Sequence, residues 1–124
     1  MHVRGIDPTA KADVLSTAQR LGALGVSVEV DEMDVNLYEV PGTQAEQYAF
    51  QAQVYGDVVE ALIASGARTS FTQYELTDAT SWLIGDPQAE GFPQAVAPVM
   101  FDANGDPKPA FYAVLNTLQQ ASGL

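Results

Sequence analysis

Two carboxylates follow a predicted strand, at a spacing that suggests nucleophilic or acid–base chemistry. Val26, Val28 and Val30 alternate with polar residues, and Glu32 and Asp34 come next. Such alternation indicates a half-buried strand, and a parallel barrel places its catalytic groups where its strands end. If the valines fill a barrel interior, Glu32 shares their face and projects into the mouth of the barrel. Glycosidic chemistry at this position would require a second carboxyl group; the alternative is a solvated acidic strand end.

Two further polar residues could assist Glu32. Asp34 could orient a neighbouring side chain, or it could be an exposed loop aspartate. His2 is the only histidine in the chain. A lone histidine near a terminus is more often incidental than catalytic, so His2 by itself predicts no function.

Aromatic residues follow a second predicted strand. Trp82, the only tryptophan, lies in a loop after that strand, while Tyr74 and Glu75 lie at its end. An aromatic ring can stack on the C–H face of a sugar, and the loops after barrel strands are where substrates bind. The alternative is that these residues pack beneath their own segment. The acidic run 102–106 lacks the glutamate ligand of a calcium loop, so we interpret it as a turn and predict no metal site.

The composition of this 124-residue chain excludes several classes of protein. Sixteen Asp and Glu against five Lys and Arg give a net charge of -11. Nucleic acids and anionic membranes are therefore poor candidate partners, because both bind clustered basic residues. The absence of cysteine excludes disulfides, thiolate metal sites and cysteine nucleophiles. Residues 1–5 lack the apolar segment of a signal peptide, which says little if Met1 is not the natural start.

Hydrophobic periodicity predicts three helices, two strands and one long loop. Gly25 suits the left-handed C-cap of the first helix, and Gly66 ends the second. The expected inward residues include Leu21 and Leu24 of the first helix, Ala45 and Ala49 of the second, and Leu118 of the third. The expected bounds are 9–24, 43–65 and 109–120 for the helices, 26–32 and 68–74 for the strands, and 76–107 for the loop.

The order helix, strand, helix, strand, helix predicts right-handed parallel βαβ units with helices covering the sheet. Two strands cannot form a self-sufficient parallel sheet, because such sheets are buried on both faces. The chain begins with the stub of another strand at residues 1–3. We therefore expect an α/β fold in which residues 1–124 are one portion of a larger structure, without internal repeats.

Four motifs in sequential order resemble the C-terminal part of glycoside hydrolase family 10, the retaining endo-β-1,4-xylanases. Residues 24–35 are similar to the family's segment around its nucleophile, and residues 51–55 to the Gln-Ala-x-x-Tyr start of its seventh helix. Residues 76–83 are similar to its "Thr-Asp-x-x-Ser-Trp-Leu" loop after the eighth strand. The fourth motif, 100–102 with 107–111, is similar to the run that leads into its eighth helix. The resemblance implies a partial (β/α)8 (TIM) barrel from the stub of strand six to helix eight.

The resemblance also implies roles for individual residues. Glu32 would be the nucleophile that forms the glycosyl-enzyme intermediate. His2 would hydrogen-bond its carboxylate, and Asp34 would hold the imidazole. Trp82 would form an aromatic wall beside the cleavage point, with Tyr74 and Glu75 also contacting substrate.

The chain departs from the family's pattern at three places. Asp31 stands where the family usually has threonine, and Tyr74-Glu75 stands where it usually has Trp-Gly. The family's general acid/base is the glutamate of an Asn-Glu pair, and no such dipeptide exists here. Because a retaining glycosidase needs both carboxyl groups, we expect the isolated chain to be inactive.

The function expected from this resemblance is hydrolysis of internal β-1,4 bonds in xylan by a complete barrel. The expected partner is xylan or a xylo-oligosaccharide, without a cofactor, nucleic acid or membrane. The parent enzyme would be an extracellular monomer. The alternatives are a non-catalytic remnant that binds xylo-oligosaccharides through Trp82 and Tyr74, or an incomplete α/β piece without activity.

Overall fold

The computed structural model describes residues 1–4, 11–86 and 94–123. Residues 9 and 10, where the first helix was expected to begin, lie outside this described part. The elements in chain order are β1 (His2–Arg4), α1 (Lys11–Ala23), β2 (Val28–Asn36), α2 (Gln44–Ala64), β3 (Thr69–Gln73), α3 (Trp82–Gly85) and α4 (Pro109–Ser122).

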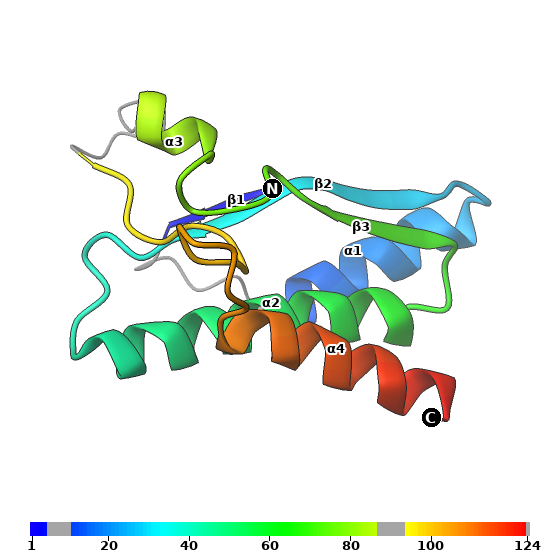
Figure 1. Cartoon of the computed structure of the whole chain (residues 1–124). Helices are drawn as coiled ribbons and strands as arrows, with labels where there is room; N and C mark the ends of the chain where they lie inside the picture. The colour runs from blue at the N-terminus through cyan, green and yellow to red at the C-terminus, as the bar shows by residue number, and fades with distance from the viewer. Residues whose placement is uncertain (5–10, 87–93, 124) are drawn as a thin grey trace.

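The three strands form one parallel sheet in the order β1-β2-β3. Helices α1, α2 and α4 lie on one side of this sheet, and α3 lies near the end where the strands finish (Figure 1). The α/β fold with parallel strands, predicted from the alternation of elements, is confirmed. Helix α3 was not predicted, because its four residues are too few to show a helical period.

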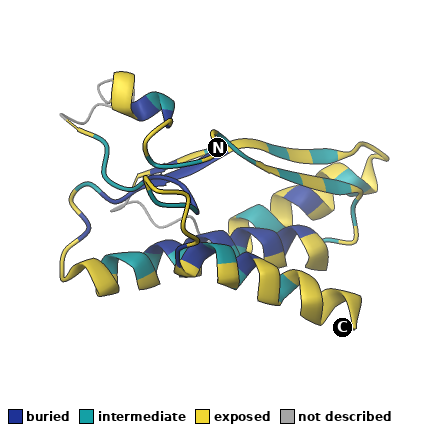
Figure 2. Cartoon of the chain, in the orientation of Figure 1, coloured by how far each residue is buried: buried dark blue, intermediate teal, exposed yellow. Residues whose placement is uncertain are grey.

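The core lies between the sheet and α2. Met33 and Val35 of β2 pack with Tyr55 and Val58 of α2, and all four are buried (Figure 2). Helix α2 also packs against α4, so it buries two sides. The prediction of a single apolar face for α2 was too simple, and its first turns (Ala45, Ala49) are exposed.

A β-bulge in β2 changes which way Glu32 points. Val30 pairs with Phe71 and Met33 with Gln73, so two residues of β2 oppose one residue of β3. Val28 and Val30 face the helices, beside Ala18 of α1 and Leu62 of α2, and Met33 and Val35 face the same side. An extra residue between them lets hydrophobic side chains on both sides of the bulge face one core.

The bulge corrects two predictions about Glu32. The strand does not end at residue 32 but runs to Asn36, so Glu32 lies inside β2. The valines fill the helix side rather than a barrel interior. Glu32, with a φ of 56°, lies on the opposite face from them, within reach of His2. The alternation of apolar and polar residues predicts the wrong face for Glu32, because it assumes strand pairing without a bulge.

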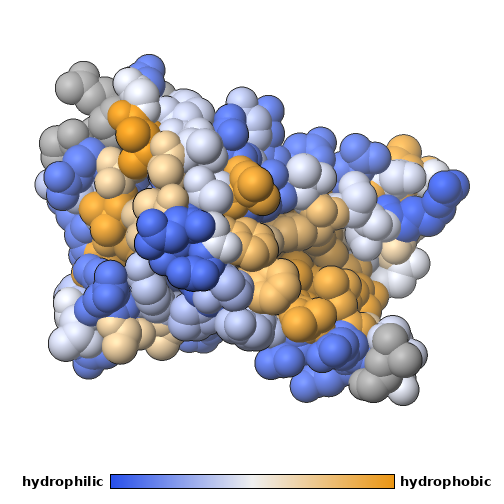
Figure 3. Space-filling model, viewed as in Figure 1, coloured by the Kyte–Doolittle hydropathy of each residue, from blue (hydrophilic) through white to orange (hydrophobic). Residues whose placement is uncertain are grey.

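Large apolar residues remain exposed on the helices. Leu24 after α1 is 77% exposed, and Leu21 and Leu118 are also exposed, although all three were expected to face inward. Apolar surface gathers below β3, over α2 and α4 (Figure 3). Within the described residues, no helix is long and apolar enough to cross a membrane.

Candidate active site

Parallel pairing of β1 with β2 brings His2 and Asp34 together. The two residues are register partners, and His2 Nδ1 lies 2.8 Å from Asp34 Oδ2. An ionised carboxylate only accepts hydrogen bonds, so Nδ1 is the donor. Asp34 is fully buried, so the interpretation as an exposed loop aspartate is wrong. The contact fixes the orientation of the imidazole ring and directs Nε2 toward Glu32.

Glu32 lies on the other side of His2. Its Oε2 atom is 3.9 Å from His2 Nε2, and 56% of its side chain is exposed. This distance exceeds that of a hydrogen bond, so the expected hydrogen bond is not formed in this conformation. The two groups are an ion pair when the imidazole is protonated. The carboxylate is thus accessible to a substrate and close to the imidazole.

Trp82 completes the cluster from a third segment of the chain. Its Nε1 donates a hydrogen bond to Asp34 Oδ2 at 2.9 Å. The ring centroids of Trp82 and His2 lie 5.1 Å apart, and those of Trp82 and Tyr74 lie 6.3 Å apart in an edge-on arrangement. The bond to Asp34 was missed from the sequence. The available signal was that a partly buried indole N–H usually has an acceptor.

Tyr74 and Glu75 follow β3 directly, as predicted. The Tyr74 amide donates to the Met33 carbonyl at 3.1 Å, which continues the ladder beyond the strand. Glu75 is exposed and has a φ of 74°, in the left-handed region. Gln73 Nε2 donates to the Glu75 carbonyl at 2.7 Å and holds this turn. Tyr74 lies edge-on to the Trp82 ring, and the Glu75 side chain is exposed.

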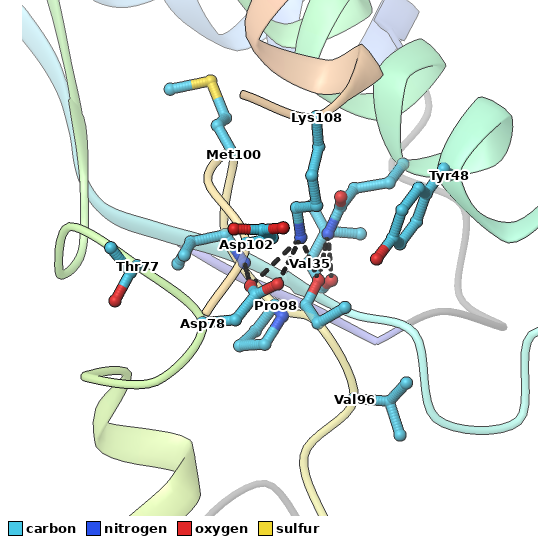
Figure 4. Close-up of polar contacts among 12 residues, drawn as sticks. Val35, Tyr48, Thr77, Asp78, Val96, Pro98, Met100, Asp102 and Lys108 are labelled. Carbon is cyan, nitrogen blue, oxygen red and sulfur yellow. Dashed lines mark hydrogen bonds and ion pairs between the residues drawn. The ribbon is translucent and has the colours of Figure 1, made fainter. Parts of the chain in front are cut away.

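A buried ion pair anchors the loop that carries Trp82 (Figure 4). Lys108 Nζ lies 2.9 and 3.0 Å from the two carboxylate oxygens of Asp78, and it also donates to the Ala97 carbonyl at 2.9 Å. The Val99 amide donates to Asp78 at 3.0 Å. Burial raises the pKa of Asp78 and lowers that of Lys108, although the pair's attraction acts against both shifts. This pair was not predicted.

Two side chains of α2 hold the backbone of residues 97–98 against β2. Gln51 Nε2 donates to the carbonyls of Val35 and Ala97, at 3.1 and 2.6 Å. The Tyr55 hydroxyl lies 3.4 Å from the Met33 carbonyl and 3.3 Å from the Pro98 carbonyl. The same helix therefore holds β2 and the 97–98 backbone together. The motif containing Gln51 and Tyr55 has a structural role beneath the cluster.

Within the described residues, no group of three or more His, Asp or Glu side chains could hold a metal ion. The acidic run 102–106 is a turn, as predicted. Asp102 Oδ1 accepts from the amides of Asn104 and Asp106, at 2.8 and 2.9 Å. These bonds hold the pKa of Asp102 below its usual range.

Residues 1–117 match the sequence profile of the family described as "Glycosyl hydrolase family 10". Among curated proteins, the chain is 35% identical over 96 residues to endo-1,4-beta-xylanase 2 from Aureobasidium pullulans. It is 32% identical over 114 residues to endo-1,4-beta-xylanase 5 from Pyricularia oryzae. These matches cover 77% and 91% of this chain, but 25% and 26% of the relatives. The chain thus spans about a quarter of the length of the curated relatives it matches.

The fold also matches part of several solved xylanase structures. Native xylanase 10B from Thermotoga maritima superposes with a TM-score of 0.80 and 23% identity, covering 100% of this chain and 36% of that protein. A mutant xylanase 10C from Cellvibrio japonicus, in complex with xylopentaose, gives a TM-score of 0.77 and 27% identity. It covers 95% of this chain and 26% of that protein. The three strands and their helices therefore have the arrangement of part of a TIM barrel.

Proposed function

The chain belongs to glycosyl hydrolase family 10, and from this membership we propose that it supplies the nucleophile side of a retaining endo-β-1,4-xylanase barrel. The observation that carries the proposal is the contact series Glu32–His2–Asp34. An exposed carboxylate lies 3.9 Å from an imidazole that a buried aspartate orients. The curated relatives are named as endo-xylanases, and one solved relative is in complex with xylopentaose.

Each residue of the cluster has a role in this proposal. Glu32 attacks the anomeric carbon and forms the glycosyl-enzyme intermediate, which water then hydrolyses. His2 places its imidazole 3.9 Å from the Glu32 carboxylate. Asp34 holds the imidazole, while Trp82 and Tyr74 offer aromatic surface to a sugar ring. Glu75 contributes a carboxylate to the substrate-binding rim where the family usually has glycine.

The resemblance places the second carboxyl group of the reaction outside the 124 residues, because the family's acid/base is the glutamate of an Asn-Glu pair that this chain lacks. Asp34 is buried and accepts two hydrogen bonds, and Asp78 is paired with Lys108. Neither can reach a leaving-group oxygen as a general acid. We therefore propose that the isolated chain hydrolyses no xylan, and that hydrolysis requires the part of the barrel that carries the acid/base.

A chimaeric barrel tests this function. The 124 residues would replace the matching segment of xylanase 10B from Thermotoga maritima, over which the folds superpose. We expect the chimaera to hydrolyse xylo-oligosaccharides with retention, and a 2-fluoro-xyloside inactivator to label Glu32. Glu32→Gln should abolish turnover. Glu29→Gln, which changes an exposed glutamate in the same strand, should not.

Two results would contradict the proposal. One is a chimaera that unfolds cooperatively but is inactive, and the other is one whose activity survives Glu32→Gln. Turnover by the isolated chain, lost on Glu32→Gln, would contradict the requirement for the rest of the barrel.

A second candidate is a non-catalytic module that binds xylo-oligosaccharides. The edge-on contact between Tyr74 and Trp82 favours it, because a preassembled aromatic pair can bind sugars without any acid/base. Calorimetry with xylopentaose on the isolated chain separates the two candidates. Saturable binding lost on Trp82→Ala, combined with an inactive chimaera, would favour the binding module.

We also propose that the parent enzyme is monomeric and extracellular, because xylan is a large polymer outside the cell.

A further inference from the structure

We propose that Trp82 is a positioning residue for the nucleophile's histidine, acting through the Asp34 carboxylate, in addition to offering a stacking surface. The inference rests on the proposed function for its consequence in catalysis. Its structural part, the bond from the indole to the carboxylate, stands on the geometry alone.

One carboxylate oxygen serves both partners. His2 Nδ1 and Trp82 Nε1 lie 2.8 and 2.9 Å from Oδ2 of Asp34. Both are short bonds from N–H to a carboxylate, and such charge-assisted bonds are stronger than neutral ones. Because Asp34 is fully buried, solvent cannot replace a donor that is lost.

The other oxygen offers no second anchor. Within the described residues, Oδ1 of Asp34 is buried and has no hydrogen-bond partner. The orientation of the carboxylate is therefore determined at Oδ2, where two donors approach from different segments of the chain. Without the indole donor, only the hydrogen bond from His2 would oppose rotation of the Asp34 carboxylate. The carboxylate could then turn, and it would no longer hold the imidazole in one orientation.

Trp82 is held well enough to act as a fixed donor. Its loop is closed at residues 77–80, where the Thr77 amide donates to Thr80 Oγ1 at 3.2 Å. The same loop is tied to α4 by Asp78 and Lys108. Trp82 then begins α3, and its carbonyl accepts from the Asp86 amide at 3.0 Å. The position of the indole thus depends on contacts outside the cluster, so it can impose an orientation on Asp34.

A purely stacking role predicts a different pattern of effects. A stacking surface requires the face of an aromatic ring, which phenylalanine largely preserves. A hydrogen-bond donor to Asp34 requires the indole N–H, which phenylalanine lacks. Trp82→Phe therefore separates the two roles, and Trp82→Ala does not.

The spectroscopic test uses the chain itself, whose single tryptophan gives one indole N–H resonance. In ¹⁵N-labelled protein we expect this proton to be shifted downfield and slow to exchange. Asp34→Ala should return it to the position of a solvent-exposed indole. Tyr74→Phe, which keeps the neighbouring ring, should leave it in place. An indole proton that exchanges freely in the unmodified chain, or is unaffected by Asp34→Ala, would overturn the contact.

The kinetic test uses the chimaeric barrel. We expect Trp82→Phe to lower kcat about tenfold, less than the roughly hundredfold loss that a 1 Å misplacement can cause, with KM changed by less than about threefold. In an Asp34→Ala background, Trp82→Phe should have no further effect on kcat, because the two changes then remove the same link. A raised KM with unchanged kcat, or full additivity of the two changes, would overturn the positioning role.

The two proposals fail in different ways. An inactive chimaera with the unmodified sequence contradicts the xylanase function and leaves the indole resonance as the test of the contact. An active chimaera in which Trp82→Phe and Asp34→Ala act independently contradicts only the positioning role.

Discussion

Lys108 and Asp78 form a buried ion pair that joins the start of α4 to the loop preceding Trp82. The ammonium lies 2.9 Å from one carboxylate oxygen, and the Lys108 side chain is 3% exposed. The ammonium also contacts the Tyr48 ring, 5.2 Å from its centroid. Because a buried charge without its partner is costly, this pair couples the stability of the fold to the placement of the indole.

Lys108→Met is expected to lower the free energy of unfolding by about 3 kcal/mol, because it leaves the largely buried Asp78 carboxylate without its cation. Urea denaturation measures the change. The matched control is Lys11→Met, which removes a surface lysine that pairs with Glu60 at 2.6 Å. This control should cost much less, because exposed ion pairs contribute little to stability. Equal losses in the two variants would contradict the assignment of a structural role to Lys108.

Gly22→Ala is expected to destabilise the chain, although alanine favours helix formation. A Cβ at residue 22 would lie 2.6 Å from the Ala67 Cβ, at a close approach between α1 and the loop that precedes β3. Overpacking of this kind costs about 1–3 kcal/mol, more than the roughly 1 kcal/mol that alanine contributes in a helix. The second change Ala67→Gly should recover part of the loss in thermal unfolding. A more stable Gly22→Ala single variant would show that α1 is free to move away.

Glu75→Gly is expected to stabilise the chain by up to about 1 kcal/mol, because residue 75 is in the left-handed region, where a Cβ is disfavoured. Glu75→Ala keeps the Cβ and should give no such gain. Chemical denaturation of both variants distinguishes relief of backbone strain from loss of charge. If alanine stabilises as much as glycine, the negative charge and not the backbone is the cause.

Stability should decrease in acid as two carboxyl groups are protonated. Hydrogen bonds from Thr43 lower the pKa of Glu46 below its ordinary 4.5, and the bonds from the Asp106 and Asn104 amides lower that of Asp102 below 3.8. Between the lowered pKa values of the folded chain and the ordinary values, the unfolded chain binds more protons than the folded chain. The free energy of unfolding therefore rises with pH in this range. Their contribution is complete above the ordinary values and is lost as pH falls through the lower folded values.

Asp78 acts in the opposite direction, because burial raises its pKa. The effect of Glu46 is therefore isolated by comparing Glu46→Gln with the unmodified chain at several pH values. The variant should be less stable at pH 7, and the difference should shrink below the ordinary pKa of 4.5. A difference that is independent of pH would contradict the role of the ionised carboxylate in the capping box of α2.

The sequence predicted the order of the elements and several local features. Gly25 and Gly66 have φ values of 77° and 70°, as helix-terminating glycines should. The long helix was expected at 43–65 and spans Gln44–Ala64; its capping box, in which Glu46 accepts from the Thr43 amide at 2.7 Å, was not predicted. These features depend on residues close in sequence, so the sequence pattern contains the information needed to predict them.

The bulge at Glu32 and the bonds to Asp34 were harder to predict from the sequence. The bulge exists because β2 must keep both Val30 and Met33 on the helix side while it pairs with β3. That condition depends on the neighbouring strand. The Trp82–Asp34 bond joins residues 48 positions apart, and the Lys108–Asp78 bond joins residues 30 apart. Neither periodicity nor the resemblance specified which atoms would meet.

The separation in sequence between His2, Asp34 and Trp82 has a consequence for the time course of folding. Contacts across 32 and 48 residues close long loops, and such contacts form slowly. Both crossovers, through α1 and through α2, must be in place before the three side chains meet. Fluorescence of the single tryptophan should therefore change in the last kinetic phase, after the helical signal has developed.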